Sequence, residues 1–214
     1  MHWIDPAHLP ETKGTVDRFL INPHGDADGL LLTSGKEVHF PPHMSKLVVA
    51  ALKPGDLVKV RGVRPRGVDM VSAVSLQAGD ASPIVDDGPP KKEAHKGEKK
   101  PKPEPHKPVD VEGIVKQVLH GPKGENRGAL LEDGTIVRLP PHAAERLHNK
   151  LAAGHKLAAR GGRLTNTLGT VIDAHEIGLT LSTLYRVEPK GPGEHGGHKP
   201  PKHDEKPRKR EPAA

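Results

Sequence analysis

Residues Gly14–Gly62 read GTVDRFLINPHGDADGLLLTSGKEVHFPPHMSKLVVAALKPGDLVKVRG, and residues Gly113–Gly161 read GIVKQVLHGPKGENRGALLEDGTIVRLPPHAAERLHNKLAAGHKLAARG. The second stretch aligns with the first at a constant offset of 99 residues, without a gap, and 17 of the 49 positions are identical. A repeat of this length is a whole domain, because solenoid repeats are only about 20–50 residues long. The sequence therefore predicts two tandem copies of one domain.

The pattern within one copy predicts five strands and one short helix. The β-rich first stretch ends at Asn22-Pro23, which is a turn signal, and Ser34-Gly35 is typical of a hairpin turn between two further strands. Apolar residues then recur at helical spacing. The expected elements are strands at 14–21, 30–33, 36–40, 57–63 and 68–76, with a helix between 41 and 52. The second copy repeats this order, with its fifth strand near 170–177.

Three strands, a helix and two strands in about 65 residues form the order of the OB-fold, a five-stranded, partly open barrel. The motif G-x-V, N-P-x-G-x-x-x-G-L-L-L, V-x-F-P-P-H and P-G-D-x-V-x-V-x-G resembles that of an uncharacterised family of bacterial OB-like domains. The resemblance covers Gly14–Leu76 well and Gly113–Ile177 moderately. It implies the barrel and supplies no reaction or ligand. The predicted fold class is all-β with one short helix per unit, as two tandem OB-fold barrels.

The expected domains are 11–80 and 111–180, and the segments outside them differ in composition. Residues 81–110 hold seven Pro and seven Lys, and residues 187–214 are rich in His, Lys and Pro. Such segments bury too little apolar surface to offset the entropy of ordering. We therefore predict a disordered Pro/Lys-rich linker at 81–110 and a disordered basic tail at 187–214.

Composition excludes several classes of protein. The absence of Cys excludes a disulfide scaffold and any zinc site built on Cys. No window approaches the ~18 apolar residues of a membrane span, and no signal peptide is visible, so we expect a cytoplasmic protein. None of the common catalytic or phosphate-binding motifs occurs, so we expect no enzyme activity and no cofactor.

Basic side chains near one barrel edge and in the tail are the candidate nucleic-acid-binding residues. OB-folds bind ligands on strands 2–3 and on the loops joining strands 1–2 and 4–5, here 22–29, 64–67, 122–128 and 163–169. Arginine can stack on bases as a ring does. Both Phe align with aliphatic residues of the other copy, so we expect them in the core. The predicted nucleic-acid-binding residues are Arg61, Arg64, Arg66, Arg160, Arg163, Lys206, Arg208, Lys209 and Arg210.

Histidines supply two weaker candidate sites. His43 and His142 follow Pro-Pro in both copies, at the start of the expected helix, where a side chain can cap the helix or an anion can bind. His195, His198 and His203 in the tail are donors of the kind that Ni²⁺, Cu²⁺ or Zn²⁺ accepts.

The leading hypothesis is a non-enzymatic OB-fold protein that binds single-stranded DNA or RNA weakly, through loop arginines and a basic tail. One alternative is an interaction scaffold whose Pro-rich tether engages a protein partner. Another is binding of a metal or a small anion through the histidines. Fold alone does not choose among these.

Overall fold

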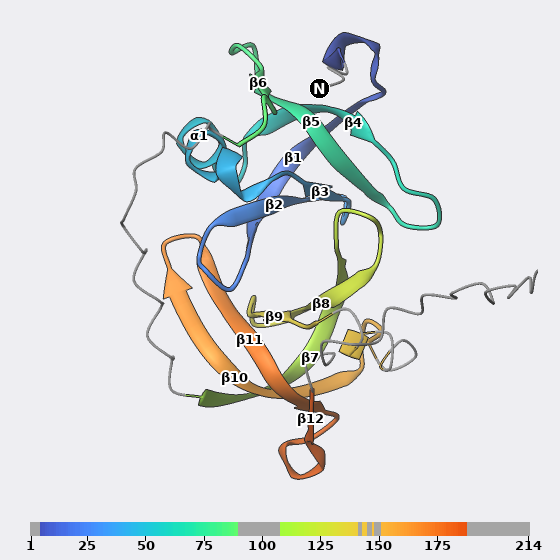
Figure 1. The fold of residues 1–214 in the computed structure, drawn as a ribbon, viewed down its shortest axis with the longest axis vertical. Coiled ribbons are helices and arrows are strands. Elements are labelled where there is room, and N and C mark those ends of the chain that lie inside the picture. The colour runs from blue at the N-terminus through green and yellow to red at the C-terminus, as the bar shows by residue number, and fades with distance from the viewer. Residues whose placement is uncertain (1–4, 90–107, 141–142, 145–146, 148–150, 188–214) are drawn as a thin grey trace, which may run out of the picture.

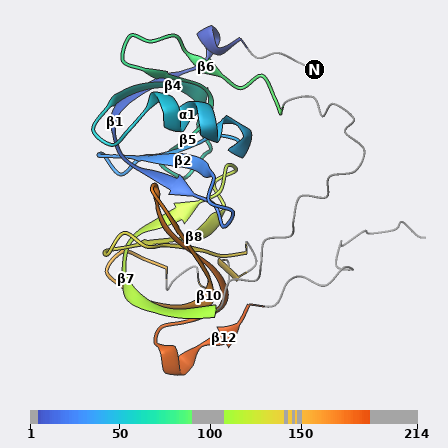
Figure 2. The same ribbon diagram turned by 90° about the vertical axis from the view of Figure 1, so that its left-hand side faces the viewer.

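A computed structural model describes residues 5–89, 108–140, 143–144, 147 and 151–187. These residues form two β-barrels, with the first stacked above the second in Figure 1. In the view turned by 90°, β2 (Ala27–Leu32) of the first barrel faces β8 (Asn126–Leu131) of the second (Figure 2). The two copies predicted from the repeat therefore pack directly on each other.

The first barrel is closed by five strands, with a short helix between the third and the fourth. Its other elements are β1 (Glu11–Ile21), β3 (Glu37–His39), η2 (Pro42–Met44), α1 (Ser45–Ala51), β4 (Leu57–Val63) and β5 (Met70–Ala78). The first half of the long β1 pairs with β4 and its second half pairs with β2. The short β3 pairs in parallel with β5 and closes the barrel. This strand order is that of an OB-fold.

The second barrel repeats the topology. Its strands are β7 (Pro108–His120), β8, β9 (Ile136–Arg138), β10 (Lys156–Asn166) and β11 (Gly169–Gly178). Again the first strand pairs with the second and the fourth, and the third closes the barrel by pairing in parallel with the fifth. The helix expected after β9 lies largely outside the described residues, although 143 and 144 are helical. The predicted fold class, two tandem five-stranded OB-fold barrels, is confirmed.

Each barrel has its own apolar core. Phe19 and Phe40 are 5% and 4% exposed and lie in the core of the first barrel, so the prediction that both aromatic rings are used in packing is confirmed. The second core is aliphatic throughout and includes Leu139, the counterpart of Phe40. Because the rings are buried, neither Phe offers a stacking surface for a base.

Two glycines allow the same close strand contact in both barrels. At Gly62 a Cβ atom would overlap the backbone oxygen of Ser72, and at Gly161 it would overlap that of Asp173. Both positions follow a register shift in the pairing of the last two barrel strands. This close backbone packing explains why both copies have Gly at this position.

Structure extends beyond the expected domain boundaries. Ile84–Val85 form β6, which pairs with β5, and Tyr185–Arg186 form β12, which pairs with β11 in the equivalent way. The first barrel therefore continues past the expected start of the linker, because β6 covers an edge of β5. Two short 3-10 helices, η1 (Pro6–His8) and η3 (Leu181–Thr183), complete the elements. Residues 90–107 and 188–214 lie outside the described part, so disorder there stays a prediction.

Among the described residues, no helix combines the length and apolar character needed to cross a membrane.

Candidate functional site

The faces that OB-folds commonly use for ligands are packed against each other here. Leu31 on β2 and Leu130 on β8 point outward from their own barrels, yet they are only 2% and 0% exposed. They belong to an apolar cluster shared by the two barrels, namely Leu20, Ile21, Leu31, Leu119, Leu130, Ile136 and Val171. In both barrels this face is therefore covered by the other barrel.

A buried ionic network crosses this interface. Glu37 of the first barrel is 2% exposed and accepts a hydrogen bond from the backbone N–H of His120 of the second barrel at 3.0 Å. The His120 ring Nδ1 lies 2.6 Å from the same carboxylate, and His39 Nε2 lies 3.1 Å from it. Burial raises the pKa of Glu37, but the bonds from His120 and His39 outweigh it and lower that pKa to about 2.

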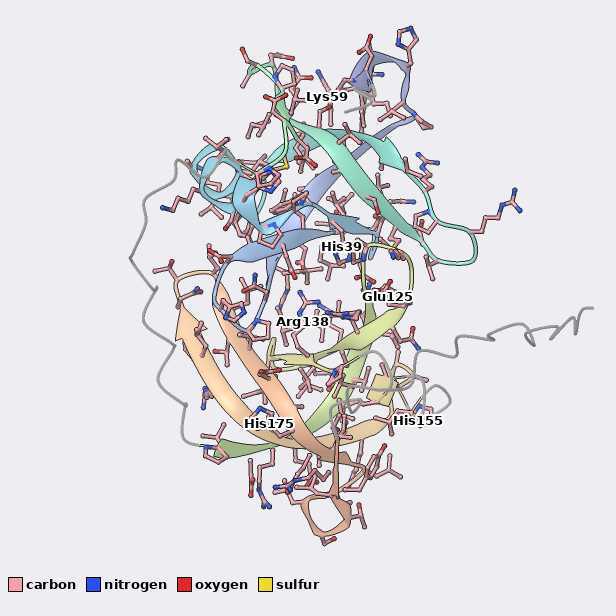
Figure 3. The ribbon with its side chains drawn as sticks, viewed as in Figure 1. His39, Lys59, Glu125, Arg138, His155 and His175 are labelled. Carbon is pink, nitrogen blue, oxygen red and sulfur yellow. The ribbon has the colours of Figure 1, made fainter. Side chains whose placement is uncertain are left out.

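A second ion pair lies beside this network, and Figure 3 shows Arg138 between the barrels. Arg138 Nη2 donates to Asp28 Oδ1 at 2.6 Å, and its Nε donates to the backbone oxygen of Ile21 at 3.1 Å. Burial raises the pKa of Asp28, and Arg138 opposes that rise. Arg138 is the counterpart of His39 in the repeat. At this one interface His39 contacts Glu37 and Arg138 pairs with Asp28, so the two copies contribute different side chains.

Two cavities of about 220 and 540 Å³ flank the network and share Asp28, His39 and Pro122. Ser72 lines the larger one beside His39, but its hydroxyl donates to the Pro122 oxygen at 2.6 Å rather than to the histidine. The polar groups of these cavities mainly serve to join the barrels.

The loops that OB-folds commonly use for ligands also meet across the interface, in two places. At one end, Asn166 Nδ2 donates to the Gly25 oxygen at 2.9 Å. At the other end, Gly124 lies against Pro65 and Val68. We call this second junction, residues 64–69 with residues 121–127, the composite loop edge. At the first junction the loop after β10 meets the loop after β1. At the second junction the loop after β4 meets the loop after β7.

The composite loop edge carries three exposed cations, Arg64, Arg66 and Lys123. Arg64 Nη2 donates to Thr12 Oγ1 at 2.7 Å and to the Glu11 backbone oxygen at 3.2 Å, so it has no carboxylate partner in the described part of the chain. Within the same residues, neither Arg66 nor Lys123 forms an ion pair. Arg64 and Arg66 are among the residues predicted from the sequence, whereas Lys123 is not, because only the packing of the two barrels brings its turn next to residues 64–69.

The acidic residues of this edge are already engaged. Asp69 is paired with Lys36. Glu125 accepts a hydrogen bond from the backbone N–H of Lys123 at 3.0 Å and lies 3.9 Å from Arg127. The edge therefore has an excess of cations that these carboxylates do not neutralise.

Arg61 and Arg160 occupy the same repeat position, and each joins two strands within its barrel. Arg61 Nη2 donates to Glu11 at 2.7 Å. Arg160 binds Asp110 through two bonds of 2.6 and 3.0 Å and also reaches Glu176 at 3.1 Å. A hydrogen bond from Arg160 lowers the pKa of Asp110, and this contact raises the pKa of Arg160. Since each guanidinium has a carboxylate partner, both are weaker candidates for contacts with a nucleic-acid backbone than the loop cations.

The remaining predicted residues fall in three groups. Arg163 is exposed but lies within β10, three residues before Asn166, because β10 runs further than the expected start of the loop at 163–169. His43 Nε2 lies 2.9 Å from Asp86 Oδ1, and such a contact with a carboxylate disfavours an anion there. Outside the described residues lie the Pro-rich segment 90–107 and His142, His195, His198, His203, Lys206, Arg208, Lys209 and Arg210. Among the described residues no group of three or more His, Asp or Glu could hold a metal ion.

No protein-family model matches the sequence, and no curated protein matches it. Among solved structures, the chain is similar to the wild-type single-stranded DNA binding protein from Thermus aquaticus, with 17% identity, a TM-score of 0.25, and coverage of 89% of this chain and 97% of that chain. A deletion mutant of the same protein gives 18% identity, a TM-score of 0.25, and coverage of 86% and 96%. At these TM-scores the likeness carries no argument about function.

Proposed function

We propose that this tandem OB-fold protein is a non-enzymatic binder of single-stranded nucleic acid, and that it contacts the phosphate backbone at the composite loop edge. The observation that supports this most is the gathering of Arg64, Arg66 and Lys123 on loops of different barrels, without carboxylate partners among the described residues. Cations placed this way attract phosphates and release counterions. The packed interface fixes their spacing.

Binding of this kind is weak and poorly selective. Sequence-tolerant binders of single strands gain about 1–3 kcal/mol for each base that stacks on an aromatic ring. Here both Phe are buried, and Tyr185 is the one exposed aromatic residue in the described part of the chain, on β12 of the second barrel. The affinity therefore depends mainly on phosphate contacts, which carry no sequence information.

Replacement of Arg66 and Lys123 by Ala is expected to weaken binding of a dT oligonucleotide several-fold at low salt. For single strands the slope of log affinity against log salt is about 0.7 per neutralised phosphate, so losing two contacts should reduce it by about 1.4. Fluorescence anisotropy over a salt series measures both quantities.

The matched control is Lys46→Ala with Lys156→Ala, because these lysines are also exposed but lie on α1 and at the start of β10. It changes net charge equally and should leave the slope nearly unchanged. Equal losses in the two double variants would show that binding follows total charge and not this edge.

The tail makes a separate contribution under the same proposal. Replacing Lys206, Arg208, Lys209 and Arg210 by Gln is expected to reduce the salt slope further, because this run carries four of the chain's 33 basic residues within five positions. If the tail variant alone abolishes binding of both dT and U oligonucleotides, the barrels do not bind and the proposal fails.

A further inference from the structure

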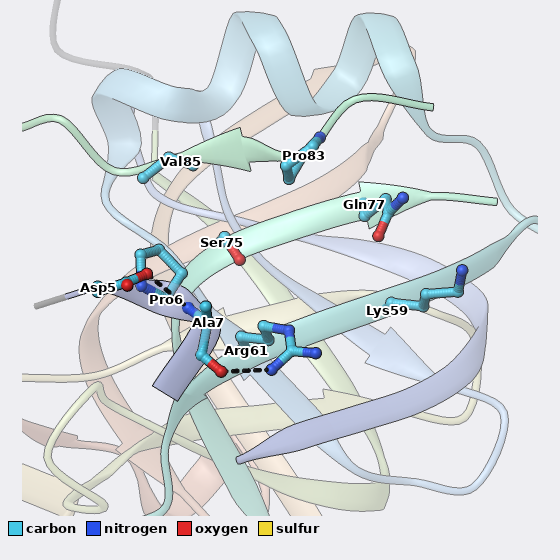
Figure 4. Close-up of a pocket in the computed structure, with 9 residues that line it drawn as sticks. All are labelled: Asp5, Pro6, Ala7, Lys59, Arg61, Ser75, Gln77, Pro83 and Val85. Atoms are coloured by element: carbon cyan, nitrogen blue, oxygen red, sulfur yellow. Dashed lines mark hydrogen bonds between the residues drawn. The ribbon is translucent and has the colours of Figure 1, made fainter. Parts of the chain in front are cut away.

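The first barrel carries a groove on the outer surface of β4 and β5, away from the interface. It has a volume of about 330 Å³. Figure 4 shows its floor, with Lys59 and Arg61 along β4 and Ser75 and Gln77 along β5. These pairs are in register, Lys59 opposite Gln77 and Arg61 opposite Ser75. The walls come from η1 on one side and from Pro83 and β6 on the other.

Ser75 is the unusual residue of this groove. It is only 4% exposed, yet its hydroxyl forms no hydrogen bond with any described residue. Buried polar side chains in folded proteins nearly always have a partner. Because Ser75 lines the groove, a molecule that binds there would supply the acceptor that this hydroxyl lacks.

Two cations also line the groove with donor capacity to spare, Arg61 opposite Ser75 and Lys59 opposite the neighbouring Gln77. Lys59 Nζ has one long contact, 3.5 Å to the fully exposed Asp80. Arg61 uses three bonds, to Glu11 and to the oxygens of Ala7 and Leu9, out of five N–H groups. Lys59 and Arg61 are therefore both able to donate to a ligand in the groove.

The acids near the groove already have partners. Asp5 accepts from the backbone N–H of Ala7 at 2.9 Å and pairs with His8 at 3.1 Å. Glu11 pairs with Lys13 at 3.2 Å as well as with Arg61, and the hydrogen bond from Lys13 lowers its pKa. The unused polar groups in the groove are therefore mainly donors.

We propose that this groove binds a small organic anion, with a phosphate or carboxylate head held by Lys59, Arg61 and the Ser75 hydroxyl. Charge-assisted hydrogen bonds of this kind are the strong ones. The groove has room for more than an inorganic ion, and its walls include Pro83 and Val85. The ligand therefore has a compact apolar body that packs on these walls. This site is separate from the composite loop edge.

The second barrel is an internal comparison. Where the first barrel has Lys59, Ser75 and Gln77, the repeat places Ala158, Glu176 and Gly178. Glu176 pairs with Arg160 at 3.1 Å, so a carboxylate takes the place that the anion would occupy. The site is therefore specific to the first barrel, and Ser75→Glu introduces the residue that the second barrel carries.

The test uses the full chain with phenyl phosphate, benzoate and benzylamine, followed by amide chemical shifts and calorimetry. We expect an anion to shift the amides of Ser75 and Gln77 and benzylamine to leave them unchanged. The two anions separate a phosphate site from a carboxylate site by their relative affinity. Ser75→Glu should weaken anion binding at least tenfold, Ser75→Ala and Lys59→Ala severalfold, and Lys156→Ala should have no effect.

The proposal is overturned if neither anion shifts these amides, or if Lys156→Ala weakens binding as much as Lys59→Ala. Because Ser75→Glu inserts a larger side chain, the dispersion of its amide spectrum is checked, and Lys59→Ala tests the site without that risk. Binding of dT oligonucleotides should be unchanged in Ser75→Ala, which separates failure at this groove from failure at the composite loop edge.

Discussion

Glu37→Gln is expected to lower the free energy of unfolding by about 3 kcal/mol at neutral pH, because the pKa of Glu37 falls from 4.5 to about 2 on folding. A carboxyl group with a lowered pKa stabilises the fold above its unfolded pKa, and this stabilisation is lost as pH falls. The difference between wild type and variant should therefore be full above about pH 5 and shrink steadily toward pH 2. Urea unfolding across this range measures it.

The difference in unfolding free energy between wild type and Glu37→Gln reports on Glu37 and not on the nearby Asp28. The pKa of Asp28 is raised by burial, so its effect on stability has the opposite sign and falls as pH rises. That contribution is present in both proteins and cancels in the difference. Glu132→Gln, at an exposed acid of the second barrel, is the control and should change stability little at any pH. A Glu37→Gln deficit that is equally large at pH 7 and pH 2.5 would contradict the role of the ionised carboxylate.

The barrels could be predicted because their turns, helix and close strand contacts each require particular residues within a short stretch of sequence. The turn at Ser34-Gly35, the helical spacing after Pro42 and the glycine at position 62 each restrict the backbone within a few residues. Repetition of the same signals 99 residues later confirmed them independently.

The interface could not be predicted in the same way, although one signal was present. Leu30, Leu31 and Leu32 form a continuous apolar run, which indicates a strand buried on both faces. In an isolated barrel only alternate residues face the core, so Leu31 needed a second partner. Nothing local shows that this partner is Leu130 of the other copy.

The roles of residues that differ between the copies depend on the same interface. Residue type alone does not show that His39 and its counterpart Arg138 lie at one interface, where they contact the different acids Glu37 and Asp28. Arg64 and Arg66 lie in the loop after β4 as expected, but Arg163 lies within β10. The Glu11 partner of Arg61 depends on the register of two strands fifty positions apart in the sequence. Side-chain partners of this kind are set by tertiary packing, which residue type alone does not specify.

Leu130→Asp is expected to separate the two barrels while leaving each folded. Leu130 is fully buried in the shared cluster, and removing a buried leucine side chain costs about 2–5 kcal/mol even without a charge. An unpaired carboxylate among apolar side chains adds a large desolvation penalty. Since each barrel has its own core, the chain avoids this penalty by opening the interface. Small-angle scattering should show a larger radius of gyration, with a dispersed amide spectrum retained.

The control is Leu57→Asp, because Leu57 is 68% exposed and lies outside the interface; it should change neither size nor spectrum. Separation also splits the composite loop edge, since Arg66 and Lys123 are then on independent bodies. Binding of dT should therefore weaken in Leu130→Asp, although the β2–β3 faces become accessible. Stronger binding after separation would instead show that those faces, closed in the intact chain, are the better nucleic-acid surface.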